Sequence, residues 1–251
     1  MMKIARFEHK GKIVWGSVHD DTIYLLEGDL FAGAKETKQK VPFKNVKLLP
    51  PVVPSKIIGI GLNYKKHIEL SPFQAPEVPM MFLKAPSSVI GHLDSIILPE
   101  AERVDYEGEM GVVIGKKAKN VKESEALNYI LGCTAVNDVS ARDYLKQDKH
   151  AFARGKGVDT FCPFGPVIAT GLNPENLEIE TRLNGKVVQS GNTNDLLFNN
   201  AQLISFISRF MTLLPGDLIA TGTPAGVAPM KKGDVIEVEV EGVGILKNFV
   251  S

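Results

Sequence analysis

Three acidic residues stand at alternate positions in the segment 104–110, namely Asp105, Glu107 and Glu109. Successive side chains of a β-strand point to opposite faces, so these carboxylates would share one face of a strand. Glu107 and Glu109 would lie about 6.6 Å apart along it, and two anions at that separation favour a cation or water between them. Carboxylate oxygens suit Mg²⁺ or Mn²⁺ better than zinc or copper. From this pattern alone, a solvated acidic face is the favoured interpretation and a divalent metal site is the alternative.

A further carboxylate, Asp138, follows an apolar stretch at residues 132–136, which predicts a strand that ends at this acid. Ser140 and Asp143 have the spacing of a capping box, which would open a helix directly after the strand. Asp138 is therefore expected at a strand terminus. Considered alone, it would serve mainly in local hydrogen bonds of the turn.

A third group of polar residues follows the predicted buried strand at residues 56–60. Asn63 is expected to cap a short helix that carries Tyr64, His67 and Glu69. Chemistry is often located at such junctions of strand, loop and helix, because a rigid element there positions an adaptable loop.

Two regions of different character hold these segments. Residues 1–50 contain short β-like runs at 3–7, 12–18 and 22–26 separated by turn-forming residues, which predicts a small N-terminal β-meander. A proline-rich stretch at 50–54 ends this lobe. Residues 55–251 are expected to form a larger β-rich domain.

The larger region carries several strand patterns, a hairpin and one helix. Strands are predicted at residues 80–83, 104–114, 129–136, 164–170, 178–183, 186–189, 217–220 and 234–240. Asn184-Gly185 predicts a type I′ turn between two of them. An amphipathic helix is predicted at about residues 200–213, and its apolar stripe comprises Leu203, Ile204, Ile207, Phe210 and Met211.

The composition narrows the class of protein. The chain has 44% hydrophobic and 23% charged residues, and 29 basic residues balance 29 acidic ones. This balance gives no net field to attract nucleic acid or an acidic membrane surface. No apolar stretch has the length of a secretion signal core or a membrane span, so a cytoplasmic location is expected. Cys133 and Cys162 lack metal-ligand spacing and are expected as buried thiols.

Taken together, the motifs of this chain resemble the fumarylacetoacetate hydrolase family. The resemblance covers about residue 55 to the C-terminus, whereas residues 1–50 match only as a variable lobe. It rests on many motifs that follow one another in the family order, and no single motif would establish it alone. They are Gly61-Leu62-Asn63-Tyr64 through His67, Phe82-Leu83-Lys84, Asp105 to Glu109, Asn137 to Asp143, Lys156 to Phe161, Gly165-Pro166, Asn184-Gly185, Gln189, Asn192-Thr193, Pro215-Gly216-Asp217, Thr221 to Val227 and Gly233-Asp234.

The resemblance implies a fold, a partner and a metal centre. The fold is a β-rich α+β chain with a mixed β-roll, and the assembly is a homodimer. Glu107, Glu109 and Asp138 are the implied ligands of Mg²⁺ or Mn²⁺. A small 2-oxo acid would bind the metal through its 2-oxo and carboxylate oxygens.

The resemblance also assigns roles around this centre. Arg142 and Thr223 are implied contacts of the substrate, and Tyr64 is expected beside them. Lys156 would hold developing negative charge. His67 would act as a base or proton shuttle, with Glu69 as its candidate acidic neighbour.

Two departures from the family pattern bear on the reaction. Hydrolytic members carry a His-x-x-Glu pair, but Leu70 stands three residues after His67, and Glu69 at the intervening position would point away in a helix. Leu145 stands where many members have a glutamine. Both changes leave the predicted metal site intact.

The expected activity is therefore carbon–carbon bond hydrolysis or decarboxylation of an acylpyruvate-like acid through a metal-stabilised enolate. A keto–enol isomerase of the 2-hydroxyhepta-2,4-diene-1,7-dioate type is the alternative. A binding protein that keeps the metal site without turnover is a further one.

Overall fold

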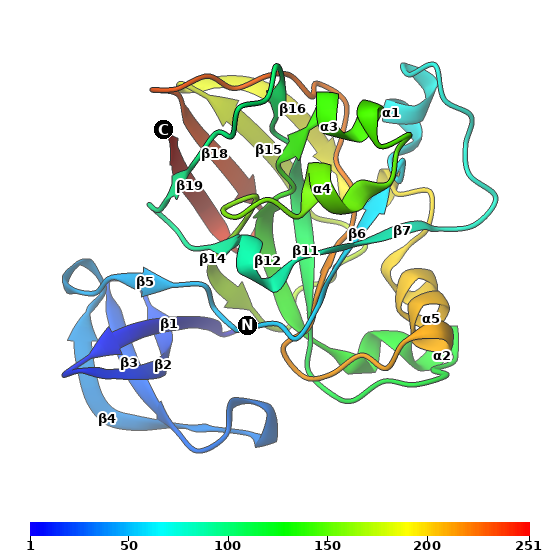
Figure 1. The fold of residues 1–251 in the computed structure, drawn as a ribbon. Coiled ribbons are helices and arrows are strands. Elements are labelled where there is room, and N and C mark those ends of the chain that lie inside the picture. The colour runs from blue at the N-terminus through cyan, green and yellow to red at the C-terminus, as the bar shows by residue number, and fades with distance from the viewer.

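The computed structural model describes residues 1–251 and is dominated by strands (Figure 1). One large sheet contains twelve strands, ten of which run in the order β4-β3-β2-β1-β14-β12-β11-β17-β6-β7. Their bounds are β4 Lys35–Pro42, β3 Thr22–Glu27, β2 Lys12–His19, β1 Lys3–His9, β14 Cys162–Ala169, β12 Ile130–Asn137, β11 Gly108–Ile114, β17 Leu218–Ala220, β6 Ile57–Gly61 and β7 Met80–Lys84. The short strands β5 (Leu48–Leu49) and β8 (Val89–Ile90) pair with β1 and β14.

Two smaller sheets complete the fold. The first has the order β16-β15-β18-β19-β9, and the second pairs β10 with β13. Their bounds are β16 Lys186–Asn192, β15 Glu178–Leu183, β18 Val235–Val240, β19 Gly244–Val250, β9 Ser95–Ile96, β10 Val104–Asp105 and β13 Ser140–Ala141. Parallel pairs occur at β6–β17, β8–β14 and β9–β19 and the other pairs are antiparallel. The fold is thus the β-rich, mixed-sheet class that the sequence predicts.

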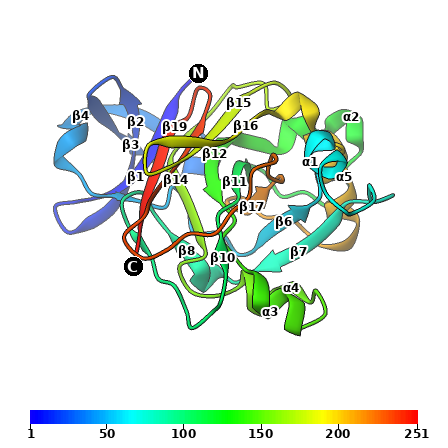
Figure 2. The same cartoon turned by 90° about the horizontal axis from the view of Figure 1, so that it is seen from above.

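The N-terminal strands continue the large sheet. β1 pairs with β14 through Lys3 opposite Ala169 and Ile4 opposite Ile168. The meander β1 to β4 extends from this junction to one side of the body (Figures 1 and 2). Phe7 and Ile23 of the meander belong to the largest apolar core cluster, so the lobe packs on the body and does not stand apart from it.

The helices are short apart from α5 (Asn200–Phe210), whose N-terminus is fixed by a capping box between Asn199 and Gln202. Leu203, Ile204 and Ile207 are buried as predicted. The prediction was wrong at the C-terminal end, because the helix stops at Phe210 and that side chain is 61% exposed. The other helices are α1 Lys65–Glu69, α2 Glu123–Ala126, α3 Arg142–Gln147 and α4 Phe152–Lys156, with five short 3₁₀ turns between elements. No helix has the length and apolarity of a membrane span.

The strand predicted at residues 104–114 is interrupted at Tyr106 and Glu107, because their backbone amides bond outside a regular ladder. The Tyr106 amide donates to the Ala228 carbonyl, and the Glu107 amide donates to the Asn137 side chain. β10 therefore pairs with β13, while β11 pairs with β12. The break turns Glu107 toward the end of β12.

Both helix caps predicted near the acidic residues are absent. α3 begins after Ala141, and the Ser140 hydroxyl instead contacts Glu107 Oε1 at 3.1 Å and the Asp138 carbonyl at 2.9 Å. α1 begins after Tyr64, while the Asn63 side chain bonds the backbone of Phe198 and Thr221. In each case a tertiary hydrogen bond replaces the local one.

The hairpin prediction is confirmed. Asn184 and Gly185 link β15 to β16 with φ of 52° and 78°, the positive values that a type I′ turn requires.

Candidate active site

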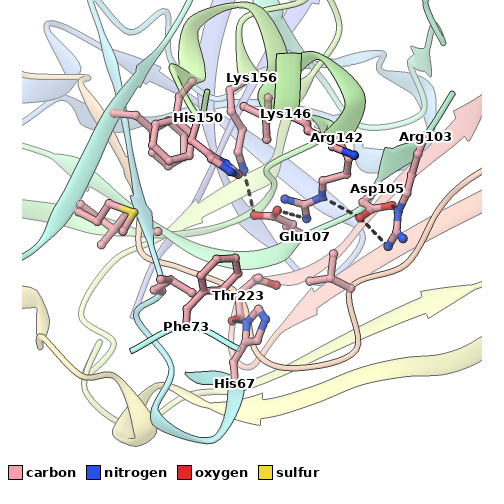
Figure 3. Close-up of a pocket in the computed structure, with 18 of the residues that line it drawn as sticks. His67, Phe73, Arg103, Asp105, Glu107, Arg142, Lys146, His150, Lys156 and Thr223 are labelled. Atoms are coloured by element: carbon pink, nitrogen blue, oxygen red, sulfur yellow. Dashed lines mark hydrogen bonds and ion pairs between the residues drawn. The ribbon is translucent and has the colours of Figure 1, made fainter. Parts of the chain in front are cut away.

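A cavity of about 1110 Å³ lies between the segment that contains α1 and the hairpin formed by α3 and α4 (Figure 3). Its lining comes from β6, α1, β7, residues 103–107, the two hairpin helices and the turn at Thr223. Among the predicted site residues, His67, Glu107, Arg142, Lys156 and Thr223 line this cavity.

Three buried carboxylates meet beside the cavity. The ligand oxygens of Glu107, Glu109 and Asp138 all lie within 4.8 Å of one another. The pairing of β11 with β12 produces this cluster, because Glu109 lies opposite Val136 and Gly108 opposite Asn137, the residue before Asp138. The sequence placed Glu107 and Glu109 on one segment and Asp138 on another, and the ladder register brings the two segments together.

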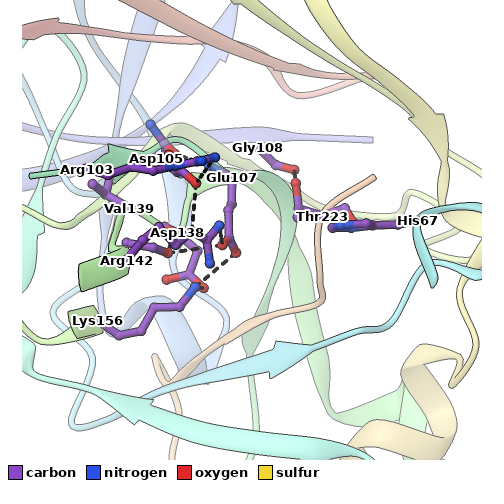
Figure 4. Close-up of polar contacts among 12 residues, drawn as sticks. His67, Arg103, Asp105, Glu107, Gly108, Asp138, Val139, Arg142, Lys156 and Thr223 are labelled. Carbon is purple, nitrogen blue, oxygen red and sulfur yellow. Dashed lines mark hydrogen bonds and ion pairs between the residues drawn. The ribbon is translucent and has the colours of Figure 1, made fainter. Parts of the chain in front are cut away.

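Two lysines contact Asp138, and one of them, Lys156, also contacts Glu107 (Figure 4 shows Lys156). Lys84 Nζ donates to Asp138 Oδ1 at 2.5 Å, and Lys156 Nζ donates to Asp138 Oδ2 at 2.5 Å and to Glu107 Oε2 at 3.0 Å. Both lysines are almost completely buried. Burial alone would lower the pKa of Lys156, but Asp138 and Glu107 outweigh it and raise the pKa. Its two carboxylate partners therefore favour the ammonium form of Lys156.

Arg142 links the cluster to a second acid. Its guanidinium donates from Nη2 to Glu107 Oε1 at 2.5 Å and from Nε to Asp105 Oδ2 at 2.7 Å, while Arg103 holds Asp105 through two further bonds. Burial would lower the pKa of Arg142, but Glu107 and Asp105 raise it. Its Nη1 has no protein partner, so that group is free to donate to a ligand in the cavity.

The two glutamates of the cluster have opposite protonation tendencies. Burial would raise the pKa of Glu107, but the charges of Lys156 and Arg142 lower it to about 2. Burial also acts on Glu109, and there Asp138 and Glu107 add to it, so its pKa is raised well above the ordinary value. The only hydrogen bond to the Glu109 carboxylate comes from the Gly222 amide at 2.8 Å.

This donor set fits a hard divalent cation. All three groups offer carboxylate oxygens close enough to share one ion, and Glu109 lacks a cationic partner. Each oxygen bound by a lysine keeps a second lone pair for a metal. A cation would also offset the repulsion from Asp138 and Glu107 that adds to burial in raising the pKa of Glu109.

His67 lies across the cavity from Glu107 (Figure 3), and its Nδ1 is 3.0 Å from the carbonyl oxygen of Thr223. A carbonyl can only accept, so Nδ1 carries the hydrogen in the neutral ring. Nε2 then holds the lone pair and can accept a proton. The imidazole is thus oriented by an uncharged group.

Thr223 is buried, and its hydroxyl is already engaged. Oγ1 donates to the Gly108 carbonyl at 2.8 Å and accepts from Gln189 Nε2 at 2.8 Å. A hydroxyl has a single hydrogen, so it has none left to donate to a substrate carboxylate. Thr223 connects the turn beneath His67 to the glycine between the two glutamates.

Two predicted site residues, Glu69 and Tyr64, belong neither to the cavity lining nor to the carboxylate cluster. Glu69 is exposed at the C-terminal end of α1 and makes no hydrogen bond or ion pair. Tyr64 is 1% exposed within the main core cluster, its hydroxyl has no partner, and burial raises its pKa, with Glu109 adding to the effect. Leu70, three residues after His67, is apolar and 79% exposed. Neither Leu70 nor the exposed Glu69 therefore supplies a carboxylate to His67.

Sequence reasoning noted Lys84 only as part of a motif and gave it no role in the site. It ends a strand of apolar residues and its partner Asp138 is 54 positions away, so only the fold reveals the contact. A lysine at the end of an apolar strand was the available signal, because a buried ammonium needs an acidic partner. Asp105 and Gln189 were noted only as parts of motifs, and both prove to be buried hydrogen-bonding groups of the site.

Comparisons with known proteins cover the whole chain. The family model described as fumarylacetoacetate hydrolase C-terminal matches residues 56–251, and one described as Rv2993c-like, N-terminal, matches residues 2–51. The mitochondrial oxaloacetate tautomerase Fahd2a of Rattus norvegicus is 44% identical over 222 residues, which are 84% of this chain and 71% of that protein.

Two solved structures are similar along their full length. The 2-hydroxyhepta-2,4-diene-1,7-dioate isomerase from Mycobacterium marinum is 38% identical, with a TM-score of 0.92 and coverage of 100% of this chain and 98% of the other. The 5-carboxymethyl-2-hydroxymuconate delta-isomerase from Mycobacterium smegmatis is 40% identical, with a TM-score of 0.93 and 99% coverage of both chains.

Proposed function

The chain belongs to the fumarylacetoacetate hydrolase family, and within this family we propose that it interconverts the keto and enol forms of a small 2-oxo acid. The observation that carries the proposal is the environment of His67. Its ring faces a cavity beside three buried carboxylates and is oriented by the Thr223 carbonyl, without an acidic partner.

His67 would move one proton between carbon and oxygen. Its Nε2 would remove a proton from C3 of the keto acid, and the electron pair of that C–H bond would form the C2–C3 double bond. The electrons of the C2 carbonyl would move onto its oxygen, which would receive the proton from Nε2. The reverse order restores the ketone, and no water or leaving group is consumed.

Arg142 and Lys156 would hold the negative charge that develops on oxygen. Lys156 uses two of its three N–H groups on Asp138 and Glu107, and Arg142 keeps Nη1 free. Both groups are fixed before any substrate binds, so they need no reorganisation during the reaction.

Glu107, Glu109 and Asp138 would hold Mg²⁺ or Mn²⁺, which would supply Lewis-acid polarisation of the 2-oxo group. This cation would change the net charge of the site, in which four acidic side chains are matched by four cationic ones. The acidic side chains Asp105, Glu107, Glu109 and Asp138 face the cations Arg103, Arg142, Lys84 and Lys156, so a divalent ion adds positive charge that suits an anionic substrate.

Hydrolysis makes a different demand on the histidine. Activation of water is assisted by a carboxylate that orients the base and stabilises the imidazolium. Glu69 is exposed and Leu70 is apolar, so His67 has no such partner here. A reversible proton transfer within one substrate does not require it, and the similar proteins include one named as a tautomerase and two named as isomerases.

Decarboxylation of an oxaloacetate-like acid is the second candidate, because it also passes through an enolate. The apolar side chains of Leu145, Phe82 and Phe152 in the cavity favour it, since such surroundings destabilise a carboxylate relative to neutral carbon dioxide.

A three-part assay tests the proposal. The protein is mixed with enol-oxaloacetate and with acetylpyruvate, in Mg²⁺, Mn²⁺ or EDTA. Loss of the enol absorbance, formation of pyruvate and formation of acetate are followed separately. Metal-dependent enol loss without pyruvate or acetate is expected. Pyruvate from oxaloacetate would favour decarboxylation, and acetate from acetylpyruvate would establish a hydrolase.

A further inference from the structure

Gln189 is hydrogen-bonded to both halves of the site. It lies on β16 of the five-stranded sheet and is 2% exposed. Its Oε1 accepts from the Gly108 amide at 2.9 Å, and its Nε2 donates to Thr223 Oγ1 and to the Pro224 carbonyl, each at 2.8 Å. The first contact reaches the glycine between the two glutamates of the carboxylate cluster. The other two reach the turn whose carbonyl orients His67.

These contacts determine how the Gln189 amide is oriented. A backbone amide can only donate and a carbonyl can only accept, so the side-chain oxygen faces Gly108 and the nitrogen faces Pro224. Both hydrogens of Nε2 are then used, one on the Thr223 hydroxyl and one on the Pro224 carbonyl. Gln189 has no hydrogen left for a ligand and does not line the cavity. Any part that it plays in the reaction is therefore indirect.

Two glycines leave the space that the Gln189 side chain occupies. A Cβ on Gly226 would lie 3.2 Å from Gln189 Cγ, and a Cβ on Gly108 would lie 3.3 Å from its Oε1. Gly226 has φ of 109°, a conformation that favours glycine. The Tyr106 hydroxyl donates to the Gly226 carbonyl at 2.9 Å, which holds the same turn a few residues farther along. The close approaches confine the glutamine to one position.

No regular ladder fixes the backbone at Thr223 and Pro224. β17 ends at Ala220, the last residue of its ladders with β11 and β6. Neither Thr223 nor Pro224 makes a hydrogen bond between backbone groups. Side-chain hydrogen bonds hold this stretch instead, and two of them come from Gln189.

The Thr223 carbonyl lies between the two groups that Gln189 Nε2 holds. One is the hydroxyl of the same residue, and the other is the carbonyl of the next residue, Pro224. Fixing both restricts rotation of the peptide between them, whose oxygen is 3.0 Å from His67 Nδ1. Figure 4 shows Thr223 between Gly108 and His67. One side chain thus fixes both the glycine of the cluster and the acceptor of the imidazole.

We propose that Gln189 is a positioning residue that sets the orientation of His67 relative to the carboxylate cluster. Its oxygen holds the glycine between the two glutamates, and its nitrogen holds the carbonyl that keeps the hydrogen on His67 Nδ1. Loss of the two N–H bonds releases this carbonyl, and the ring then also adopts the Nε2–H tautomer, which has no lone pair at Nε2 to accept a proton. This inference rests on the proposed function for the role of His67 as the base.

Two variants break the contact from opposite sides. Gln189→Met keeps an unbranched side chain of similar length and removes the amide. Thr223→Val removes the hydroxyl that Gln189 holds and leaves the backbone carbonyl in place. Asn248→Leu is the matched control, because Asn248 is a buried amide of the same sheet that donates to two backbone carbonyls and does not line the cavity.

Exchange of the C3 protons of oxaloacetate, followed by NMR in D₂O with saturating Mg²⁺, measures the effect on the reaction. Gln189→Met should lower kcat about 10- to 100-fold, the scale of a small misplacement of a reacting group, and change KM little. Asn248→Leu should lower Tm similarly and leave kcat near the wild-type value. The double variant of Gln189→Met and Thr223→Val should be no slower than the slower single variant, because both act through one carbonyl. Multiplied losses, or an equal loss in Asn248→Leu, would overturn the positioning role.

The tautomer of His67 provides a readout that needs no turnover. Nitrogen NMR of protein labelled at its histidines, with Mg²⁺ and at a pH where the ring is neutral, reports it, and His67→Asn identifies the signals. Wild type and Asn248→Leu should show the Nδ1–H form, and Gln189→Met a larger share of the Nε2–H form. An unchanged tautomer in Gln189→Met would overturn the inference and leave the proposed function standing. A changed tautomer would support the inference even if the wild type showed no exchange, a result that would contradict only the proposed function.

Discussion

Glu109 is the member of the carboxylate cluster that no cation neutralises, and its raised pKa reflects burial together with Asp138 and Glu107. Glu109→Gln should therefore stabilise the metal-free protein, because it removes an acid that is costly to ionise at neutral pH. A gain of about 1 kcal/mol corresponds to a rise of about 2–4 °C in Tm for a chain of this size. The same variant should lose the Tm increase that Mn²⁺ gives the wild type. Thermal melts with and without metal measure both effects.

Glu107→Gln and Asp138→Asn provide the matched contrast. Each removes the acid from a buried ion pair with Lys156, which leaves an uncompensated charge at a typical cost of about 3–5 kcal/mol. Both should melt below the wild type without metal. Equal Tm changes for all three variants would contradict the electrostatic description of the cluster.

The pKa of Glu107 predicts a pH dependence of stability. Its value of about 2 lies below the ordinary 4.5, so its stabilising contribution is complete above pH 4.5 and is lost as the pH falls toward 2. The difference in unfolding free energy between wild type and Glu107→Gln should narrow over this interval. Urea titrations of the metal-free proteins at a series of pH values measure it, and a constant difference would argue against the ion pairs.

His67→Asn should lower kcat about 10²- to 10⁴-fold, the usual contribution of a positioned base. The metal-dependent Tm increase should persist, because His67 contacts Thr223 and not the carboxylates. Glu69→Gln is the control, and its turnover should stay near the wild-type value because Glu69 is exposed. A large loss in Glu69→Gln would mean that this acid reaches His67 during catalysis.

The alternation of Asp105, Glu107 and Glu109 made the acidic segment visible in the sequence. The pattern could not separate their roles, because Asp105 bonds two arginines while Glu107 and Glu109 join Asp138. Nor could it reveal Lys84, whose burial depends on the approach of β7 to the end of β12. Contacts between distant segments decide these assignments.

At the level of elements, β11 depends on a close approach to β15. A Cβ on Gly108 would lie 1.9 Å from Thr181 Oγ1, and Gly108 stands between Glu107 and Glu109. Gly108→Ala should cost about 1–3 kcal/mol through overpacking. Thr181 Oγ1 is buried without a partner, so adding Thr181→Ala should restore part of the lost Tm. Thermal melts of the single and double variants test this, and no rescue would place the strain elsewhere.

The sequence predicted most strands to within a few residues, because buried strands such as β12 and β14 have long apolar runs. β4 was not predicted, since its residues Lys35–Pro42 are largely polar and lie at a sheet edge. The predictions of an unbroken strand at residues 104–114 and of two helix caps failed for a different reason. The side chains of Asn137 and Ser140 form hydrogen bonds with Glu107, which lies about 30 positions away in the sequence. The spacing of neighbouring residues cannot predict such partners.

At the scale of the whole molecule, we propose that residues 1–50 are an N-terminal lobe and residues 55–251 the catalytic part of a homodimer. The dimer proposal is supported by exposed apolar side chains on and near β19. Ile245 and Phe249 are 40% and 41% exposed, and Leu93 and Ile97 nearby are 53% and 58% exposed. Sedimentation at micromolar concentration should give twice the chain mass of 27.3 kDa. A species of 27.3 kDa would remove the dimer.

The central claim is that the carboxylate cluster and His67 together enolise a 2-oxo acid. Deuterium incorporation at C3 of oxaloacetate in D₂O, measured by NMR above the spontaneous rate, tests it most directly. Wild type with Mn²⁺ should exchange C3 protons without forming pyruvate. EDTA should abolish the enzymatic exchange, and His67→Asn should lower its rate about 10²- to 10⁴-fold. Exchange that is unaffected by EDTA, or pyruvate formation in place of exchange, would contradict the account.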